Sequence, residues 1–276
     1  MILASPVVSA EWVAAHLDEV RLVDVRWSMD GGPKRAEFEA GHLPGAVFAD
    51  LDTDLSDPPG ERGRHPLPSP AHFAEVRGRL GLDERPVVAY DDQSGAVAGR
   101  LWWMLDAIGR PAAVLDGGIE AWAAPLEPGP GDEPGLPAVE PVDWPSDRFV
   151  EVDELLGAID DGGVLVDARS HERFIGSPNP IDPRLGHVPG ARSRPWTDNV
   201  GADGRFLPIE DLRTALAAVG VTPGTDLLAS CGSGVTGCHD LLAARLIGVE
   251  GGRLYTGSWS EWALDETRPV ATGEAD

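Results

Sequence analysis

One cysteine of the chain stands where a side chain could act as a nucleophile. Cys231 follows the apolar run Leu227–Ala229, and a glycine-containing loop and a helical pattern come after it. In an α/β sheet, a residue at the C-terminal end of a strand lies where such sheets bind ligands. Glycines let the loop curl, so that several backbone N–H groups and the start of the helix can face one atom. Such a loop favours the thiolate of Cys231 and would stabilise a persulfide anion on it. The loop residues that we expect to surround a substrate are Gly232, Ser233, Gly234, Val235 and Thr236.

Other chemistries at a cysteine loop fit these residues less well. An arbitrary cysteine is most often a small buried hydrophobe, and Cys238 inside the helix keeps that interpretation. Phosphatase loops of this kind place an arginine six residues after the cysteine, but here that position is Gly237, so a phosphoryl group would lack its bidentate clamp. A zinc site made of Cys231, Cys238 and His239 lacks a fourth ligand and the usual spacing. We therefore expect neither a metal nor an organic cofactor.

Length and charge limit what the chain can be. Its 276 residues are enough for two domains, and 42% of them are apolar, so each domain can form a core. The formal net charge of -24 argues against binding to nucleic acid or acidic membranes, which depends on basic patches. The two cysteines form no disulfide framework and suit a reducing compartment. With neither a signal peptide pattern nor an apolar run that could span a bilayer, we expect a soluble, cytoplasmic protein.

Several phrases occur twice in the same order, which predicts a duplicated domain. The phrase "GHLPGA" at residues 41–46 returns as "GHVPGA" at residues 186–191. In the same way "VVAYDD" at residues 87–92 corresponds to "LLASCG" at residues 227–232. Offsets that are nearly constant along the chain indicate a repeat rather than scattered coincidence.

The repeat suggests how the chain is divided. We expect an N-terminal domain over residues 1–124, a Pro- and Gly-rich linker over 125–147, and a C-terminal domain over 148–276. Asp91 stands in the first copy where Cys231 stands in the second, so the first copy has no sulfur nucleophile.

Strand and helix patterns alternate within each copy. This alternation predicts an α/β fold with a mainly parallel sheet covered on both faces. A glycine follows each predicted helix and fits a left-handed C-cap. The predicted strands are Leu22–Val25, Val87–Tyr90, Val164–Asp167 and Asp226–Ser230, and the predicted helices are Ala71–Leu80, Ala98–Ile108, Glu210–Val219 and Gly237–Ile247.

Taken together, these motifs resemble the tandem-domain rhodanese family of thiosulfate and 3-mercaptopyruvate sulfurtransferases. The resemblance extends over nearly the whole chain and includes "AGHLPGAVFADLD", "HPLP", "YDDQSG", "LDGGIEAW", "RFIG", "GHVPGARS", "CGSGVTGCH" and "YTGSWSEW". It implies two tandem rhodanese-like domains, each a five-stranded, mainly parallel sheet flanked by helices. It also implies that only the C-terminal domain is catalytic.

The resemblance also implies roles for single residues. Arg173 in "ERFIG" matches the arginine that holds the carboxylate or sulfonate of the substrate. Asp52 in "FADLD" and His65 in "RHPLP" match an aspartate and a histidine that join Ser233 in a hydrogen-bonded triad, for which the first domain must reach into the site of the second. Arg184, close to "GHVPG", matches a second substrate arginine after a shift of a few residues. The structural alternatives are a surface salt bridge for Arg173 and a turn for Asp52.

The loop composition favours one sulfur donor. Members that prefer thiosulfate tend to have basic residues after the cysteine, whereas members that prefer 3-mercaptopyruvate tend to read CGSGVT, as Cys231–Thr236 do here. We predict an enzyme that moves sulfane sulfur from 3-mercaptopyruvate, through a Cys231 persulfide, to a thiol, a thioredoxin-like protein or cyanide, with release of pyruvate. Two alternatives stay open: thiosulfate:cyanide transfer, and a catalytically silent tandem-rhodanese binding module.

Overall fold

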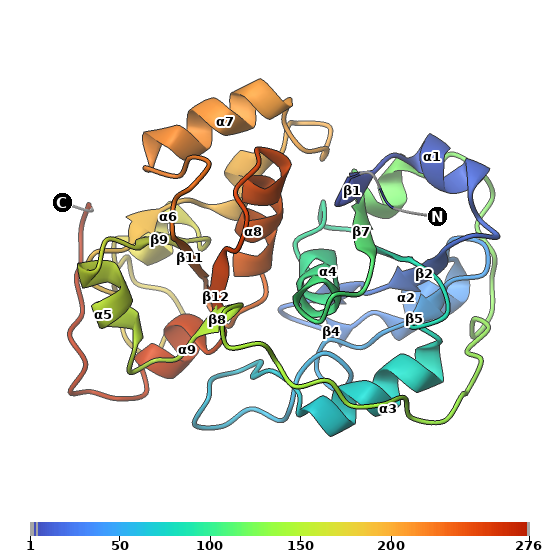
Figure 1. Cartoon of the computed structure of the whole chain (residues 1–276), viewed down its shortest axis with the longest axis horizontal. Coiled ribbons are helices and arrows are strands. Elements are labelled where there is room, and N and C mark those ends of the chain that lie inside the picture. Colours follow the sequence, from blue (N-terminus) through green and yellow to red (C-terminus); the bar gives the residue numbers. More distant parts are fainter. Residues whose placement is uncertain (1–2, 4, 275–276) are drawn as a thin grey trace. The chain divides into compact units, whose positions relative to one another are not determined.

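A computed structural model of the chain describes residues 3 and 5–274 and contains two compact units (Figure 1). Unit 1 comprises Met1–Asp57, Leu67–Trp144 and Ala202–Phe206, and unit 2 comprises Pro58–Pro66, Pro145–Gly201 and Leu207–Asp276. The short segment Pro58–Pro66 thus belongs to unit 2, although it comes from the first half of the sequence. The domain boundaries 1–124, 125–147 and 148–276 stay a prediction, and their outermost residues 1, 2, 4, 275 and 276 lie outside the described residues.

Unit 1 is built on a five-stranded parallel sheet with the strand order β1-β7-β6-β2-β5. The strands are β1 (Val7–Val8), β2 (Arg21–Asp24), β5 (Val47–Phe48), β6 (Val87–Tyr90) and β7 (Ala112–Leu115). The helices are α1 (Ala10–Ala15), α2 (Arg35–Ala40), α3 (Pro70–Leu80), α4 (Ala98–Ala107) and the 3-10 helix η1 (Gly118–Ala121). A separate antiparallel pair is formed by β3 (Trp27–Ser28) and β4 (Gly32–Pro33).

Unit 2 repeats this topology. Its parallel sheet has the order β8-β12-β11-β9-β10, which matches the first sheet strand for strand. The strands are β8 (Phe149–Val150), β9 (Val164–Asp167), β10 (Arg192–Ser193), β11 (Leu227–Ser230) and β12 (Arg253–Tyr255). The helices are α5 (Leu155–Asp160), α6 (His171–Phe174), α7 (Ile209–Ala218), α8 (Gly237–Leu246), α9 (Ser258–Trp262) and the 3-10 helix η2 (Trp196–Asn199). The predicted fold class, two α/β domains with five-stranded parallel sheets, is confirmed.

A repeated arginine fixes the end of the second strand in each unit. In unit 1, Arg26 donates from Nε to both carboxylate oxygens of Asp24, at 3.1 and 2.9 Å, and from Nη2 to the carbonyl of Gly41 at 2.8 Å. The same contacts recur in unit 2 between Arg169, Asp167 and the carbonyl of Gly186. The buried pair ties the strand end to the turn of the repeated "GH-PG" phrase, so this phrase has a structural role.

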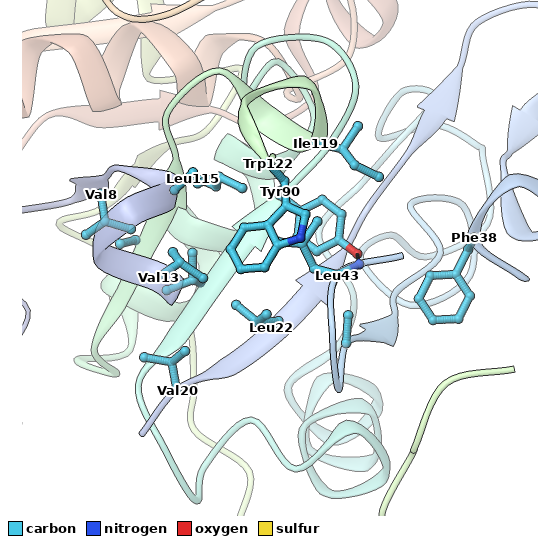
Figure 2. Packing of buried hydrophobic residues seen from close by; sticks show 14 of the residues in the cluster. Val8, Val13, Val20, Leu22, Phe38, Leu43, Tyr90, Leu115, Ile119 and Trp122 are labelled. Atoms are coloured by element: carbon cyan, nitrogen blue, oxygen red, sulfur yellow. Dashed lines mark hydrogen bonds between the residues drawn. The ribbon is translucent and has the colours of Figure 1, made fainter. Parts of the chain in front are cut away.

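The apolar faces of the two sheets are covered by separate cores. Figure 2 shows the core of unit 1, where Leu22 and Tyr90 from neighbouring strands pack with Val13 of α1 and with Trp122. The Tyr90 hydroxyl accepts the N–H of Leu43 at 3.1 Å, so the buried phenol is satisfied. In unit 2 the corresponding core contains Leu165, Leu228, Tyr255, Trp259 and Trp262.

The Pro- and Gly-rich segment after Trp122 lies against unit 1. Its single tryptophan, Trp144, stacks on Phe73 with ring centroids 5.4 Å apart and donates its indole N–H to the carbonyl of Pro68 at 2.8 Å. Arg77 donates to the carbonyl of Glu140 at 2.6 Å. Contacts of this kind fix most of the predicted linker, so it is no freely moving chain.

The long predicted elements agree with the structure to within a residue or two. Each of the four predicted C-cap glycines, Gly81, Gly109, Gly220 and Gly248, has a positive φ. Both cysteines are free thiols. Within the described part of the chain, no helix is both long and apolar enough to cross a bilayer.

Candidate active site

Cys231 lies directly after β11, and its sulfur is enclosed by the loop that follows. Sγ accepts the backbone N–H of Ser233 at 3.4 Å and that of Gly234 at 3.1 Å, and the residue is only 2% exposed. Gly234 has a φ of 75°, which turns its N–H toward the sulfur at no steric cost. The next helix, α8, begins at Gly237. The sulfur therefore lies in a cradle of backbone donors that stabilises negative charge.

The hydroxyl of Ser258 hydrogen-bonds the backbone of Cys231. Its Oγ accepts the N–H of Cys231 at 3.0 Å, donates to the carbonyl of Tyr255 at 2.8 Å and lies 4.0 Å from the cysteine sulfur. Ser258 has a φ of 51°, a left-handed conformation that costs a non-glycine residue about 1–2 kcal/mol. Ser258 was not predicted from the sequence. The repeat does contain a signal for it: the equivalent position in the first copy is Gly118, so a glycine position there carries a side chain here.

Two guanidinium groups lie over the backbone of Gly232. A Cβ atom at Gly232 would be 2.9 Å from Nη2 of Arg64 and 3.1 Å from Nη2 of Arg173. Arg173 belongs to α6, and Arg64 belongs to the segment Pro58–Pro66 of unit 2. Glycine at position 232 thus lets two positive charges approach the residue that follows Cys231. The sequence reasoning identified Arg173 and missed Arg64, which stands directly before His65 in the quoted "RHPLP".

Asp182 fixes the orientation of Arg173. Nε and Nη2 of Arg173 donate to its two carboxylate oxygens at 2.9 and 2.6 Å, a bidentate arrangement. Nη1 of Arg169 lies 3.5 Å from the same carboxylate. Burial by itself would raise the pKa of Asp182, but the hydrogen bond from Arg173 and the charges of Arg173, Arg169 and Arg64 outweigh it and lower that pKa. Asp182 is therefore ionised at neutral pH and balances part of the positive charge here. It was also missed by the sequence reasoning.

Ser233 and His65 lie together in unit 2. His65 Nδ1 is 2.8 Å from Ser233 Oγ, and the two residues are 9% and 7% exposed. Asp52, the third residue of the predicted triad, belongs to unit 1, where its carboxylate accepts the indole N–H of Trp27 at 3.1 Å. The structure thus brings two of the three residues together, and the part of Asp52 in a triad stays a prediction.

The remaining predicted residues are divided between the loop and the C-terminal segment of the chain. Val235 is buried and Thr236 is the N-cap of α8, so both lie in the loop around the sulfur. Arg184 donates to the carbonyl oxygens of Asp265 at 2.7 Å and Arg268 at 3.0 Å. Its guanidinium therefore ties down the C-terminal segment, and a role in substrate binding stays a prediction.

Comparison with known proteins identifies the family. A sequence model of the rhodanese-like domain matches the chain twice, over residues 9–125 and 151–265. The chain belongs to the rhodanese-like family. A Pseudomonas aeruginosa protein with the provisional name 3-mercaptopyruvate sulfurtransferase is 43% identical over 289 aligned positions, covering 98% of this chain and 99% of the relative. SseB of Mycobacterium tuberculosis, provisionally named a thiosulfate sulfurtransferase, is 40% identical over 267 positions, covering 94% of this chain and 93% of the relative. The crystal structure of SseA from Escherichia coli, described as a 3-mercaptopyruvate sulfotransferase, matches with a TM-score of 0.79 and 33% identity, over 94% of this chain and 100% of that chain.

The first rhodanese-like domain has the same loop, with a carboxylate in place of the sulfur. One oxygen of Asp91 accepts the N–H groups of Gln93 at 2.9 Å and Gly95 at 2.8 Å. The other oxygen accepts those of Val97 at 2.8 Å and Ala98 at 2.9 Å. The cradle of the first domain is therefore filled by an anion of the chain itself.

Both rhodanese-like domains bend the backbone around the loop in the same way. Ser94 with a φ of 57° corresponds to Gly234, and Gly118 with a φ of 59° corresponds to Ser258. The N–H of Ile119 donates to the carbonyl of Asp91 at 2.8 Å, as that of Trp259 donates to the carbonyl of Cys231 at 3.0 Å. The loop conformation is thus a property of the fold and does not depend on the cysteine.

A second polar cluster is buried beneath the first turn of α8. Asp240 is fully buried; one of its carboxylate oxygens accepts from Asn199 at 2.6 Å, and the other has no hydrogen-bond partner among the described residues. Arg194 donates to the side-chain oxygen of Asn199 at 2.7 Å. Burial raises the pKa of Asp240 to about 7, against the opposing charge of Arg194. The cluster therefore contains a carboxyl group that is half protonated near neutral pH.

Proposed function

We propose that this rhodanese-like protein is a 3-mercaptopyruvate sulfurtransferase with Cys231 as its sulfur carrier. The observation that carries the proposal is the cradle around Sγ, with two backbone N–H groups on the sulfur and the guanidinium of Arg173 over the next residue. Backbone donors favour a thiolate and a persulfide anion, and the arginine suits a donor that is a small carboxylate. The two named mercaptopyruvate relatives described above support the same donor.

In the proposed first half-reaction, the Cys231 thiolate attacks the sulfur of 3-mercaptopyruvate while Arg173 holds the carboxylate. The new S–S bond forms as the carbon–sulfur bond breaks, and its electron pair passes into the enolate of pyruvate. A proton then reaches the methylene carbon and gives pyruvate, so no external oxidant or reductant is needed. We propose that His65 and Ser233 polarise the donor's carbonyl or deliver that proton, with Asp52 as the third member; their 2.8 Å hydrogen bond supports this role.

In the second half-reaction an acceptor takes the outer sulfur and restores the Cys231 thiolate. We propose a small thiol, a thioredoxin-like protein or cyanide as acceptor, and no part for nucleic acid or membranes, in keeping with the net charge of -24. The two free thiols support the cytoplasmic location that the sequence suggests.

The test is direct loading of the protein. After incubation with 3-mercaptopyruvate, mass spectrometry should show one added sulfur atom on Cys231, and turnover should fall strongly in Arg173→Ala. Cys231→Ser should abolish loading and turnover, whereas the matched variant Cys238→Ser should keep both, because Cys238 is buried inside α8. The same incubation is made with thiosulfate. A protein that takes sulfur from neither 3-mercaptopyruvate nor thiosulfate would be a binding module, and one that clearly prefers thiosulfate would be a thiosulfate sulfurtransferase.

A further inference from the structure

Arg64 is fixed to the active-site side of unit 2 by its own backbone. Its N–H donates to Ser260 Oγ of α9 at 3.0 Å, two residues after Ser258, which accepts the N–H of Cys231. The preceding residue, Gly63, pairs with Gly60 through two backbone hydrogen bonds of 3.0 Å, which closes the segment into a tight loop. A Cβ atom at Gly63 would lie 2.6 Å from Ser260 Oγ, so only glycine allows this contact. The position of Arg64 is therefore built into the fold of unit 2.

The guanidinium of Arg64 has more N–H donors than acceptors among the described residues. Its only hydrogen bond among the described residues is a weak one, from Nη1 to the carbonyl of Ile181 at 3.5 Å. A guanidinium has five N–H donors, and a half-buried one satisfies them with an anion or with water. The other arginine over Gly232, Arg173, is already paired with Asp182, whose charge also acts on Arg64.

The positive charges of Arg64 and Arg173 over Gly232 favour the binding of an anion. Burial lowers the pKa of Arg64, and the positive charge of Arg173 acts in the same direction, while Cys231 and Asp182 oppose it. Two guanidinium groups held side by side repel each other, and a carboxylate between them removes that cost. In a chain of net charge -24, this concentration of positive charge is local and specific.

We propose that Arg64 is the second arginine that binds the donor's carboxylate, and that with Arg173 it forms a clamp over Gly232. The proposal rests on the proposed function, because it names the group that this donor site would hold. Adjacent Cα atoms are about 3.8 Å apart, so an anion over Gly232 is within the length of a three-carbon keto acid from the sulfur of Cys231. Arg184, the arginine that the motif pattern favours for this role, is already used on the carbonyl groups of Asp265 and Arg268.

The experiment compares Arg64→Gln and Arg64→Lys with Arg62→Gln, which removes the same charge from an exposed residue of the same loop. We expect Arg64→Gln to lower kcat/KM for 3-mercaptopyruvate about 10- to 100-fold, mainly through KM, the range of one or two charge-assisted hydrogen bonds. Arg64→Lys should fall between wild type and Arg64→Gln, because lysine keeps the charge and loses the fork. Pyruvate, which has the carboxylate and no sulfur, should inhibit Arg64→Gln more weakly by a similar factor, whereas Arg62→Gln should match wild type.

The outcomes separate this inference from the proposed function. If wild type gains no sulfur from either donor, the proposed function fails. If wild type loads and turns over, but both Arg64 variants keep the KM and the pyruvate inhibition of Arg62→Gln, only the assignment of Arg64 is wrong. The same conclusion follows if Arg184→Gln instead weakens both donor and pyruvate binding. Should Arg64→Gln fold poorly by circular dichroism, Arg64→Lys and its pyruvate inhibition decide the question.

Discussion

The buried carboxyl of Asp240 should make the stability of unit 2 depend on pH, and Asp240→Asn should remove that dependence. The folded protein holds this group with a pKa of about 7, whereas the ordinary value is 3.8. Between these two pH values the folded state binds more protons than the unfolded state, so stability falls as pH rises. The contribution of the protonated group is complete below about pH 4 and is lost once the pH has passed about 7.

The size of the effect follows from the same pKa difference. Each pKa unit corresponds to about 1.4 kcal/mol, so ionised Asp240 costs the fold about 4 kcal/mol at pH 8. Asparagine keeps an oxygen that can accept the 2.6 Å hydrogen bond from Asn199 and carries no charge. We therefore expect Asp240→Asn to be close to wild type at pH 4 and more stable than wild type at pH 8.

The assay is urea unfolding of both proteins at several pH values, followed by tryptophan fluorescence and, for Asp240 itself, by carboxyl carbon NMR. Asp153→Asn is the matched control, because it removes a carboxylate whose side chain is 91% exposed in the same unit. A stability difference between Asp240→Asn and wild type that stays constant from pH 4 to pH 8 would refute the reasoning. So would a carboxyl resonance of Asp240 that titrates near pH 4.

Three further outcomes test the two loops. Asp91→Ala should lower the free energy of unfolding of unit 1 by several kcal/mol in urea unfolding, because four backbone N–H groups lose their acceptor at about 1–3 kcal/mol each, while sulfur loading of Cys231 should persist; an unchanged free energy of unfolding would contradict the assigned contacts. Gly232→Ala should raise KM for the donor about 10-fold in steady-state kinetics, because its methyl group would displace Arg64 and Arg173, and an unchanged KM would mean that neither arginine binds substrate from this position. Asp182→Asn should cost about 3 kcal/mol in urea unfolding at pH 7, since it leaves buried positive charge unpaired. Because the folded state lowers the pKa of Asp182, this deficit is complete above 3.8 and should shrink as the pH falls from there through the folded-state pKa; a deficit that instead grew as the pH was lowered below 3.8 would count against the ion pair.

The local part of the site could be predicted from sequence, because it depends on neighbours in the chain. A strand, a glycine loop and a helix around Cys231 follow from residue types within a dozen positions, and the repeat pointed to Asp91 as its counterpart. The long helices α3, α4, α7 and α8 were predicted to within about two residues for the same reason.

The residues that complete the site come from distant segments, and no local sequence pattern predicts them. Arg64 is more than 150 residues from the cysteine, and its relevance depends on how Gly63 packs on Ser260. Asp182 lies in a stretch where the motif spacing shifts, so the motif drew attention to Arg184 instead. Ser258 could have been found from the repeat alone, by asking why a glycine position of the first copy carries a side chain in the second.

The contacts of Asp91 show which backbone N–H groups of the loop a longer anion can reach. An aspartate oxygen stands one bond further from Cα than a cysteine sulfur, the same number of bonds as the outer sulfur of a persulfide. In the second loop the sulfur contacts the N–H groups of positions 233 and 234, but the aspartate of the first loop reaches amides equivalent to those of positions 235, 237 and 238. In the second domain the N–H of Cys238 donates to the carbonyl of Val235 at 3.1 Å. The outer sulfur of the proposed Cys231 persulfide would extend toward the amides that correspond to those on Asp91, so the first domain shows which donors a longer anion in this loop can use.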